Sequence, residues 1–217
     1  MKWQRRRRRR RRRKKSSFGN TMWNVAKSAA KLFLNPEYKV VNNSANAYAI
    51  TDATSPIMYT PFQSIIQGTD NDNRIGRSIK ITNFHMRGNF IINSSATQTC
   101  IRVMCVLDKQ TNGALFSLNQ LIEDAGSGHR SIISNRDLEE TRRFKVYHDQ
   151  VYCLQKGIEE IVPFEFNVKP NKHIDYHNNS GTITGLREAS LHVVIFSSEA
   201  VNTPTMNMRY RGRFLDN

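Results

Sequence analysis

Long apolar runs and the short signatures of common catalytic sites are both missing from this 217-residue sequence. No stretch of 18 apolar residues occurs, and the cations at the front are not followed by the apolar core of a signal peptide. We therefore expect a protein that neither inserts into a membrane nor is secreted. The P-loop, the Gly-x-Ser-x-Gly elbow and the His-Glu-x-x-His zinc motif are also absent. We expect no enzyme and no cofactor.

Cysteine is scarce. Cys100, Cys105 and Cys153 form an odd set without a CxxC pair. If Cys100 and Cys105 lie on one strand, they point to opposite faces of it, because side chains alternate along a strand. We expect all three to be reduced thiols, in the core or at the surface.

Acidic residues are absent from the first fifteen positions, where many of the basic residues are concentrated. The chain has 33 Lys and Arg against 18 Asp and Glu, a formal charge of +15. Lys2, nine consecutive arginines and two lysines supply 12 of the 33, so 21 basic residues face 18 acidic ones in the rest of the chain. The excess charge predicts a polyanionic partner that binds the arm through Arg5, Arg6, Arg7, Arg8, Arg9, Arg10, Arg11, Arg12, Arg13, Lys14 and Lys15.

Residues 1–17 are predicted to be a disordered arm, because adjacent guanidinium groups repel one another and bring no apolar face to bury. Clustered cations gain free energy by displacing counterions from nucleic acid, and the guanidinium fork matches phosphate oxygens. Contacts between guanidinium groups and phosphate oxygens do not distinguish one base sequence from another. A nuclear-import signal or a solvated tail is the alternative, and import and packaging can share one segment.

Residues 18–36 are predicted to form a short amphipathic helix and a linker. Apolar residues recur there at helical spacing: Met22, Val25, Ala26, Ala29, Leu32 and Phe33. Lys27 and Lys31 are four residues apart, and the helix is expected to end before Pro36. We assign Lys27 and Lys31 to the nucleic-acid-binding set.

From residue 37 onward, short apolar alternations broken by Gly, Asn, Pro and Ser predict an all-β sandwich or barrel. Residues 191–196 are apolar on both faces, which predicts a central strand covered on both sides. Only 117–124 is weakly helical. The predicted strands are 38–50, 75–92 with a break near Asn83, 99–107, 143–154, 161–168, 189–197 and 206–215.

The last strand places three arginines on one face, because Arg209, Arg211 and Arg213 alternate with Met208, Tyr210, Gly212 and Phe214. Tyr210 and Phe214 are then expected in the core. The arginine face is either solvated or turned toward nucleic acid or a neighbouring subunit's carboxylates. We include the three arginines among the predicted nucleic-acid-binding residues.

Metal signals are weak. His173, Asp175 and His177 would share a face if extended, and a metal-dependent enzyme is the rival function that they suggest. They lie among turn residues, so we expect a polar surface loop over 169–181 and no metal. The stretch Asp70–Asn73 hints at calcium, but Ile81 occupies the twelfth position of that loop, where an EF-hand requires Glu. A calcium site of another kind stays open.

Four features together carry a family resemblance: the basic arm with the short helix, QGTDNDNRIGRSIKI at 67–81 followed by MRG at 86–88, ASLHVVIFSS at 189–198, and the ending PTMNMRYRGRFLDN. The chain resembles the coat proteins of circular single-stranded DNA viruses that encode a replication initiator, the circovirus-like group. The arm, the helix and the IIQG arrangement are also similar to the coat protein of satellite tobacco necrosis virus, an RNA satellite. DNA or RNA as the genome therefore stays open, with DNA favoured.

The resemblance implies a jelly roll of eight main strands over 37–217, and about sixty copies that close an icosahedral T=1 shell. It places the arm on the single-stranded genome inside the virion and makes loops 108–113 and 169–181 candidates for outer decoration or subunit contacts. We expect the arm also to serve as a nuclear localisation signal that host import factors bind in the infected cell's nucleus. The alternative is a cellular chromatin or ribosomal protein with a basic tail.

Overall fold

The computed structural model describes residues 38–111, 113–126 and 128–216. The predicted arm 1–17 and the predicted helix within 18–36 lie outside the described residues. No described helix is long and apolar enough to span a membrane. The described strands are β1 (Tyr38–Ala49), β2 (Ile57–Tyr59), β3 (Ser78–Ile91), β4 (Gln98–Asp108), β5 (Phe144–Gln155), β6 (Ile161–Val168), β7 (Lys172–Tyr176), β8 (Leu186–Glu188), β9 (Ser190–Ser197) and β10 (Thr205–Asp216).

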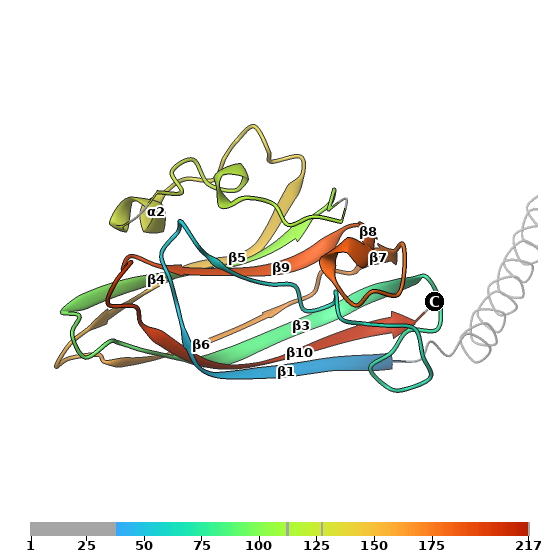
Figure 1. The fold of residues 1–217 in the computed structure, drawn as a ribbon, viewed down its shortest axis with the longest axis horizontal. Helices are drawn as coiled ribbons and strands as arrows, with labels where there is room; N and C mark the ends of the chain where they lie inside the picture. Colours follow the sequence, from blue (N-terminus) through green and yellow to red (C-terminus); the bar gives the residue numbers. More distant parts are fainter. Residues whose placement is uncertain (1–37, 112, 127, 217) are drawn as a thin grey trace, which may run out of the picture. The chain divides into compact units, whose positions relative to one another are not determined.

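The strands form two antiparallel sheets (Figure 1). One sheet has the order β1-β10-β3-β7-β8, and β6 also pairs with β3. The other has the order β2-β9-β4-β5. Strand β3 is long enough for two partners in succession, since β6 pairs with its residues 84–91 and β7 with its residues 78–81.

The connectivity is that of a jelly roll. If β6 and β7 are taken as one interrupted strand and the short β8 is left aside, the eight strands run 1-8-3-6 in one sheet and 2-7-4-5 in the other. Consecutive strands therefore lie in opposite sheets, with the exception of β4 and β5, which are neighbours in the same sheet. This is the arrangement of two interlocked Greek keys. The all-β prediction and the jelly roll implied by the resemblance are confirmed.

The main core fills the space between the two sheets and is rich in aromatic side chains. Phe84 is fully buried, with its ring 5.5 Å from that of Tyr210 and 6.2 Å from that of Phe62. Phe90 stacks on Phe164 at 4.4 Å. Large aromatic rings bury much area for few rotatable bonds, and the contact of Phe90 with Tyr152 of β5 at 5.4 Å joins the two sheets.

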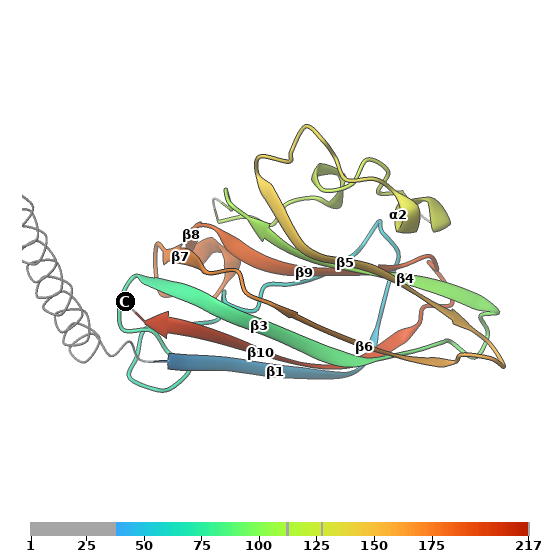
Figure 2. The same cartoon turned by 180° about the vertical axis from the view of Figure 1, so that it is seen from behind.

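A second core lies on the outer face of the four-stranded sheet, under the segment 109–143 that connects β4 to β5 (Figures 1 and 2). This segment includes the short helix α2 (His129–Ile133) and a 3₁₀ turn at Leu118–Gln120. Phe116, Ile132 and their neighbours cover Met104 of β4 and Phe196 of β9. As a result β9 is buried at every position, and the prediction of a doubly covered strand over 191–196 is confirmed.

Buried ion pairs hold the covering segment in place. The Arg102 guanidinium on β4 donates to both oxygens of Asp149 at 2.8 and 2.9 Å, and its Nη1 donates to the Ser134 carbonyl beside α2 at 2.7 Å. At the root of the segment Arg143 donates to both oxygens of the fully buried Asp108, at 3.0 and 2.8 Å. Two-pronged pairs of this kind fix geometry as well as charge.

The prediction of three reduced thiols is wrong for two of them. Cys100 and Cys153 form a disulfide, because the pairing of β4 with β5 sets the two residues opposite each other with their Cα atoms 4.1 Å apart. The residues are 53 positions apart in the sequence, so only the strand register brings them together. Cys105 is a free, buried thiol between the sheets, on the face opposite Cys100 as alternation requires, and burial raises the pKa of this thiol.

Two local predictions need correction. Residues 172–176, expected within a polar loop, form β7, because they pair with the first half of β3. Residues 117–124 contain only one 3₁₀ turn, and the α-helix of this region begins later, at His129. The other predicted strands are confirmed, and the break expected near Asn83 appears as a register shift between Arg213 and Phe214 where β10 pairs with β3.

Candidate nucleic-acid interface

The outer face of the six-stranded sheet carries a cluster of basic side chains, here called the basic face: His85 and Arg87 of β3 with Arg209, Arg211 and Arg213 of β10. In the register of the two strands Arg209 lies opposite Arg87, and Arg211 lies opposite His85. Directly opposed residues of an antiparallel pair project to the same side of the sheet. The four arginines are exposed, and the histidine is partly exposed.

The alternate residues of β10 point into the core, as predicted. Met208 is 3%, Tyr210 8% and Phe214 0% exposed. Gly212 completes the row because a Cβ built there would lie 2.5 Å from the Phe62 ring, too close for any side chain. The arginine face is therefore a direct consequence of packing on the other side of the same strand.

Positive charge on the basic face is only partly balanced. A concavity of about 880 Å³ crosses it, and Glu165 of β6 is the one acidic residue in its lining. The Glu165 carboxylate lies 2.7 Å from His85 Nε2. Arg211 donates to the amide oxygen of Asn42 at 2.8 Å, which is a neutral partner. Arg87 lies between Arg209 of β10 and Glu165 of β6, so a carboxylate offsets the like-charge pair on one side only, while Arg209 has no acidic residue opposite it in this register.

The described fold begins with the edge strand of this same sheet. β1 begins at Tyr38 and pairs with β10, so that Val40 lies opposite Arg213. The start of β1 is anchored by the buried Lys39, whose Nζ lies 3.3 Å from Asp216. Asp216 Oδ2 also accepts a hydrogen bond from the Ile75 backbone at 2.6 Å. The predicted binding residues of the arm, together with Lys27 and Lys31, lie outside the described residues.

The motif 67–81 has a structural role close to the start of β1, where the Val40 backbone N–H donates to the Asn71 carbonyl at 3.2 Å. Arg74 is 1% exposed, donates to the carbonyls of Gly76 at 2.5 Å and Asn178 at 2.9 Å, and lies 4.2 Å from the centre of the Tyr176 ring. Burial lowers the pKa of its guanidinium. Arg74 therefore ties the loop to the residues after β7 and is not available to a phosphate.

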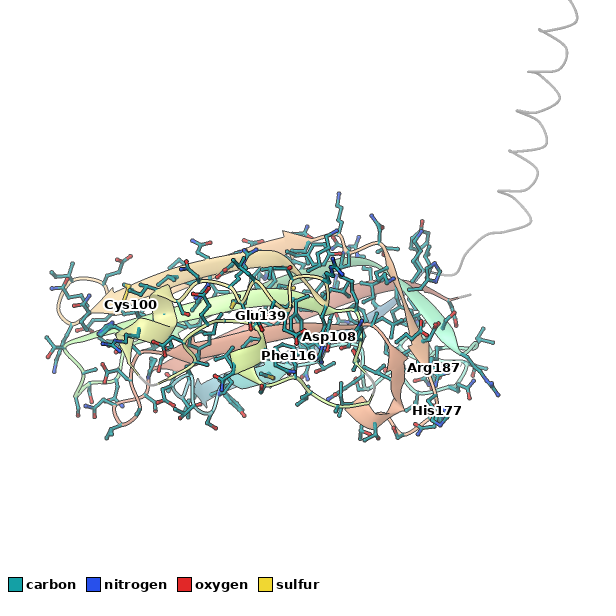
Figure 3. All side chains as sticks on the ribbon, turned by 90° about the horizontal axis from the view of Figure 1, so that it is seen from above. Cys100, Asp108, Phe116, Glu139, His177 and Arg187 are labelled. Carbon is teal, nitrogen blue, oxygen red and sulfur yellow. A yellow bond between two sulfur atoms is a disulfide. The ribbon has the colours of Figure 1, made fainter. Side chains whose placement is uncertain are left out.

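The residues weighed as metal ligands are spread over a strand and the loop beyond it. His173 lies opposite Lys80 and Asp175 opposite Ser78, on the outer side of the sheet, whereas His177 lies past the end of β7 (Figure 3). In the loop 70–73, the Asn73 amide donates to the Asp70 carboxylate at 3.1 Å. Within the described ranges, no group of three or more His, Cys, Asp or Glu side chains is placed to hold a metal ion.

Sequence reasoning found the arginines of β10 but missed Arg87 and His85. The signal was present, since both alternate with the buried Phe84, Met86 and Phe90. What the pattern lacked was the pairing of β3 with β10, which places the two basic sets side by side.

Comparison with known proteins gives distant likenesses only. No protein-family model matches the chain, and no curated protein matches it. Among solved structures, the chain is similar to Desmodium yellow mottle tymovirus at 10% identity over 83% of this chain and 88% of that one, with a TM-score of 0.37. It is also similar to Cocksfoot mottle virus, with 9% identity, 83% and 84% coverage and a TM-score of 0.40. For a virus-like particle of Macrobrachium rosenbergii nodavirus the values are 10%, 84%, 85% and 0.36. At these identities none of them assigns the chain to a family.

Proposed function

We propose that this chain is the coat subunit of a small icosahedral virus, which assembles through its jelly roll and packages single-stranded nucleic acid through the arm and the basic face. Jelly rolls serve viral shells, lectins and cupin enzymes, so the fold alone does not choose among these functions. The observation that carries the proposal is the position of the charge. Twelve cations lie within the first fifteen residues of the sequence, and the described fold carries four exposed arginines and a histidine on one open sheet face.

The two basic elements suit different tasks. An arm without an apolar face can follow any phosphate backbone and adds affinity through counterion release, with a salt slope of at most about −8 on single strands, from roughly −0.7 per phosphate. The basic face holds its guanidinium groups on a rigid sheet and so offers fixed positions. A shell subunit must neutralise a long polyanion without reading its sequence, and this division of charge does so.

The finer parts of the proposal rest on the resemblance of 67–81, 189–198 and the C-terminal stretch. They are a T=1 shell of about sixty copies, circular single-stranded DNA as the cargo, and a second role for the arm in nuclear import. The location is then the virion and, during infection, the host nucleus.

Purification of the full-length chain, followed by electron microscopy and sedimentation, tests the assembly. We expect closed particles that contain nucleic acid sensitive to DNase and resistant to RNase. RNase-sensitive cargo would overturn the DNA assignment alone. Protein that sediments as a monomer or dimer under every salt and nucleic-acid condition would overturn the coat function and favour a cellular nucleic-acid-binding protein.

Deletion of residues 1–17 tests the arm separately. A run of cations brings no apolar surface to bury, so the melting temperature should change little while the packaged length of nucleic acid falls sharply. A truncated protein that packages a normal length would show that the arm is not the packaging element.

A further inference from the structure

The outer face of the six-stranded sheet changes character one row beyond Arg87 and Arg209. Two residues further along each strand, Asn89 lies opposite Asn207, and Pro163 of β6 lies opposite Asn89. Side chains two positions apart on a strand face the same way, about 7 Å apart, so the amide row follows directly on the arginine row. Pro163 is exposed, and the two asparagines are partly exposed.

A second concavity, of about 670 Å³, spans both rows. Arg87 and Arg209 line it on one side together with Glu165, whose carboxylate is paired with His85 at 2.7 Å, and Asn89, Asn207 and Pro163 line it on the other. It meets the larger concavity of the basic face at Arg87, Glu165 and Arg209. The two hollows therefore form one continuous surface in which guanidinium, amide and proline groups succeed one another.

Amide side chains add a chemistry that phosphate binding does not need. Each carries two donors and an acceptor, which match the hydrogen-bonding edges of nucleic-acid bases. The Asn207 oxygen already accepts from the Ala47 backbone at 2.8 Å, which orients this amide and presents its nitrogen as the donor for a ligand. The exposed ring of Pro163 offers a small apolar surface that a base can contact, and the opposed guanidinium groups of Arg87 and Arg209 offer a place for one phosphate.

We infer that these five residues form a nucleotide subsite. One phosphate lies between Arg87 and Arg209, the attached base lies over Pro163, and Asn89 and Asn207 hydrogen-bond the base edge. The inference rests on the proposed function and deepens it, because it names the ligand as a strand with unpaired bases. A duplex keeps its Watson–Crick edges paired, and a polyanion without bases fills only the arginine half.

The test compares three ligands of equal length on the full-length protein: a single-stranded oligonucleotide, its abasic counterpart and a duplex. The wild type should bind the base-bearing strand about three- to tenfold more tightly than the abasic strand, the gain expected from one or two net hydrogen bonds. Asn89→Ala combined with Pro163→Ala should abolish that ratio. Arg87→Gln should weaken binding of both strands alike. Asn119→Ala, an exposed asparagine on the covering segment, is the matched control and should leave the ratio unchanged.

Photo-crosslinking on the unmodified protein supplies a second readout that needs no variant. A strand with a photoreactive base should crosslink to peptides that contain Asn89, Pro163 or Asn207. Equal affinity of the wild type for base-bearing and abasic strands, or base crosslinks confined to the arm, would overturn the subsite while nucleic-acid binding stands. Failure of the wild type to bind any strand would overturn the proposed function itself.

Discussion

Strands β9 and β10 follow one another in the chain and obey the same alternation, yet their outer faces differ completely. In β9, Val194 and Phe196 face outward from the sandwich and are fully buried beneath the segment 109–143. In β10, Arg209 and Arg211 face outward and are exposed. The outer face of one sheet is therefore covered and the outer face of the other is open, and the two faces have different roles. The covered sheet stabilises the fold through a second hydrophobic core, and the open sheet is available to a ligand.

The largest expected effect concerns core positions on either strand. Phe214→Ala should cost about 3 to 5 kcal/mol of unfolding free energy, because the ring is 0% exposed between the sheets. Phe196→Ala, on the outer side of β9, should cost a similar amount because that side is also core. Denaturant unfolding of both variants measures this. A cost under 1 kcal/mol for Phe196→Ala would show that the segment 109–143 does not cover the sheet in solution.

The ion pair under the covering segment comes next. Arg102→Ala should cost about 3 kcal/mol, because it leaves the Asp149 carboxylate, 16% exposed, without its two-pronged partner. Arg136→Ala is the control. Its guanidinium also contacts Asp149 but is half exposed, so its loss should cost under about 1 kcal/mol. Equal melting temperatures for the two variants would show that Arg102 is not the main partner of the Asp149 carboxylate.

The covered face should also respond to acid. His192 lies under the segment 109–143, its two ring nitrogens lie next to the Thr60 and Ser190 hydroxyls, and burial lowers its pKa to about 4. The nearby Asp108 opposes this shift and Arg143 adds to it. As the pH falls, His192 of the unfolded chain binds a proton near pH 6.5, whereas His192 of the folded chain binds one only near pH 4. Stability from this group is therefore complete above pH 6.5 and is lost as the pH falls toward 4, by about 3 kcal/mol.

A His192→Asn variant isolates that contribution, since asparagine does not titrate. Unfolding free energies measured between pH 7 and pH 4 should fall less steeply for the variant than for the wild type. Parallel curves would show that other groups, such as Asp149 with its pKa lowered by Arg102 and Arg136 against the opposing effect of burial, account for the acid sensitivity.

The smallest effect on stability is expected on the open face. Replacement of Arg209, Arg211 and Arg213 by Gln should change the unfolding free energy by less than about 1 kcal/mol, because exposed charges contribute little. The same triple variant should reduce the salt slope of single-strand binding by about 2, from roughly 0.7 per lost phosphate contact. Normal particles with a normal amount of nucleic acid and an unchanged salt slope would show that these arginines only face solvent and do not bind nucleic acid.

Much of the fold follows from local patterns. Alternation located seven strands and predicted the inward Phe214 and the outward Arg211, because the side chains of a strand point to its two faces in turn. Residues 172–176 were misjudged as a loop because turn residues flank them and their polar positions face solvent. Only their pairing with β3 shows that they are a strand. The disulfide was missed for the same reason.

Local sequence patterns were enough to predict where the charge lies, which positions of each strand are apolar, and that β9 is covered on both sides. These properties depend on neighbours one or two positions away. The three-dimensional fold was needed to show that Arg87 lies opposite Arg209, that Asn89 lies opposite Asn207 and that Cys100 bonds to Cys153. It was also needed to show that the segment 109–143 covers one sheet and leaves the other open. Each of these depends on the register between strands far apart in the chain. That register is set by the packing of the whole core, because a slip of one residue would turn every buried side chain to the opposite face.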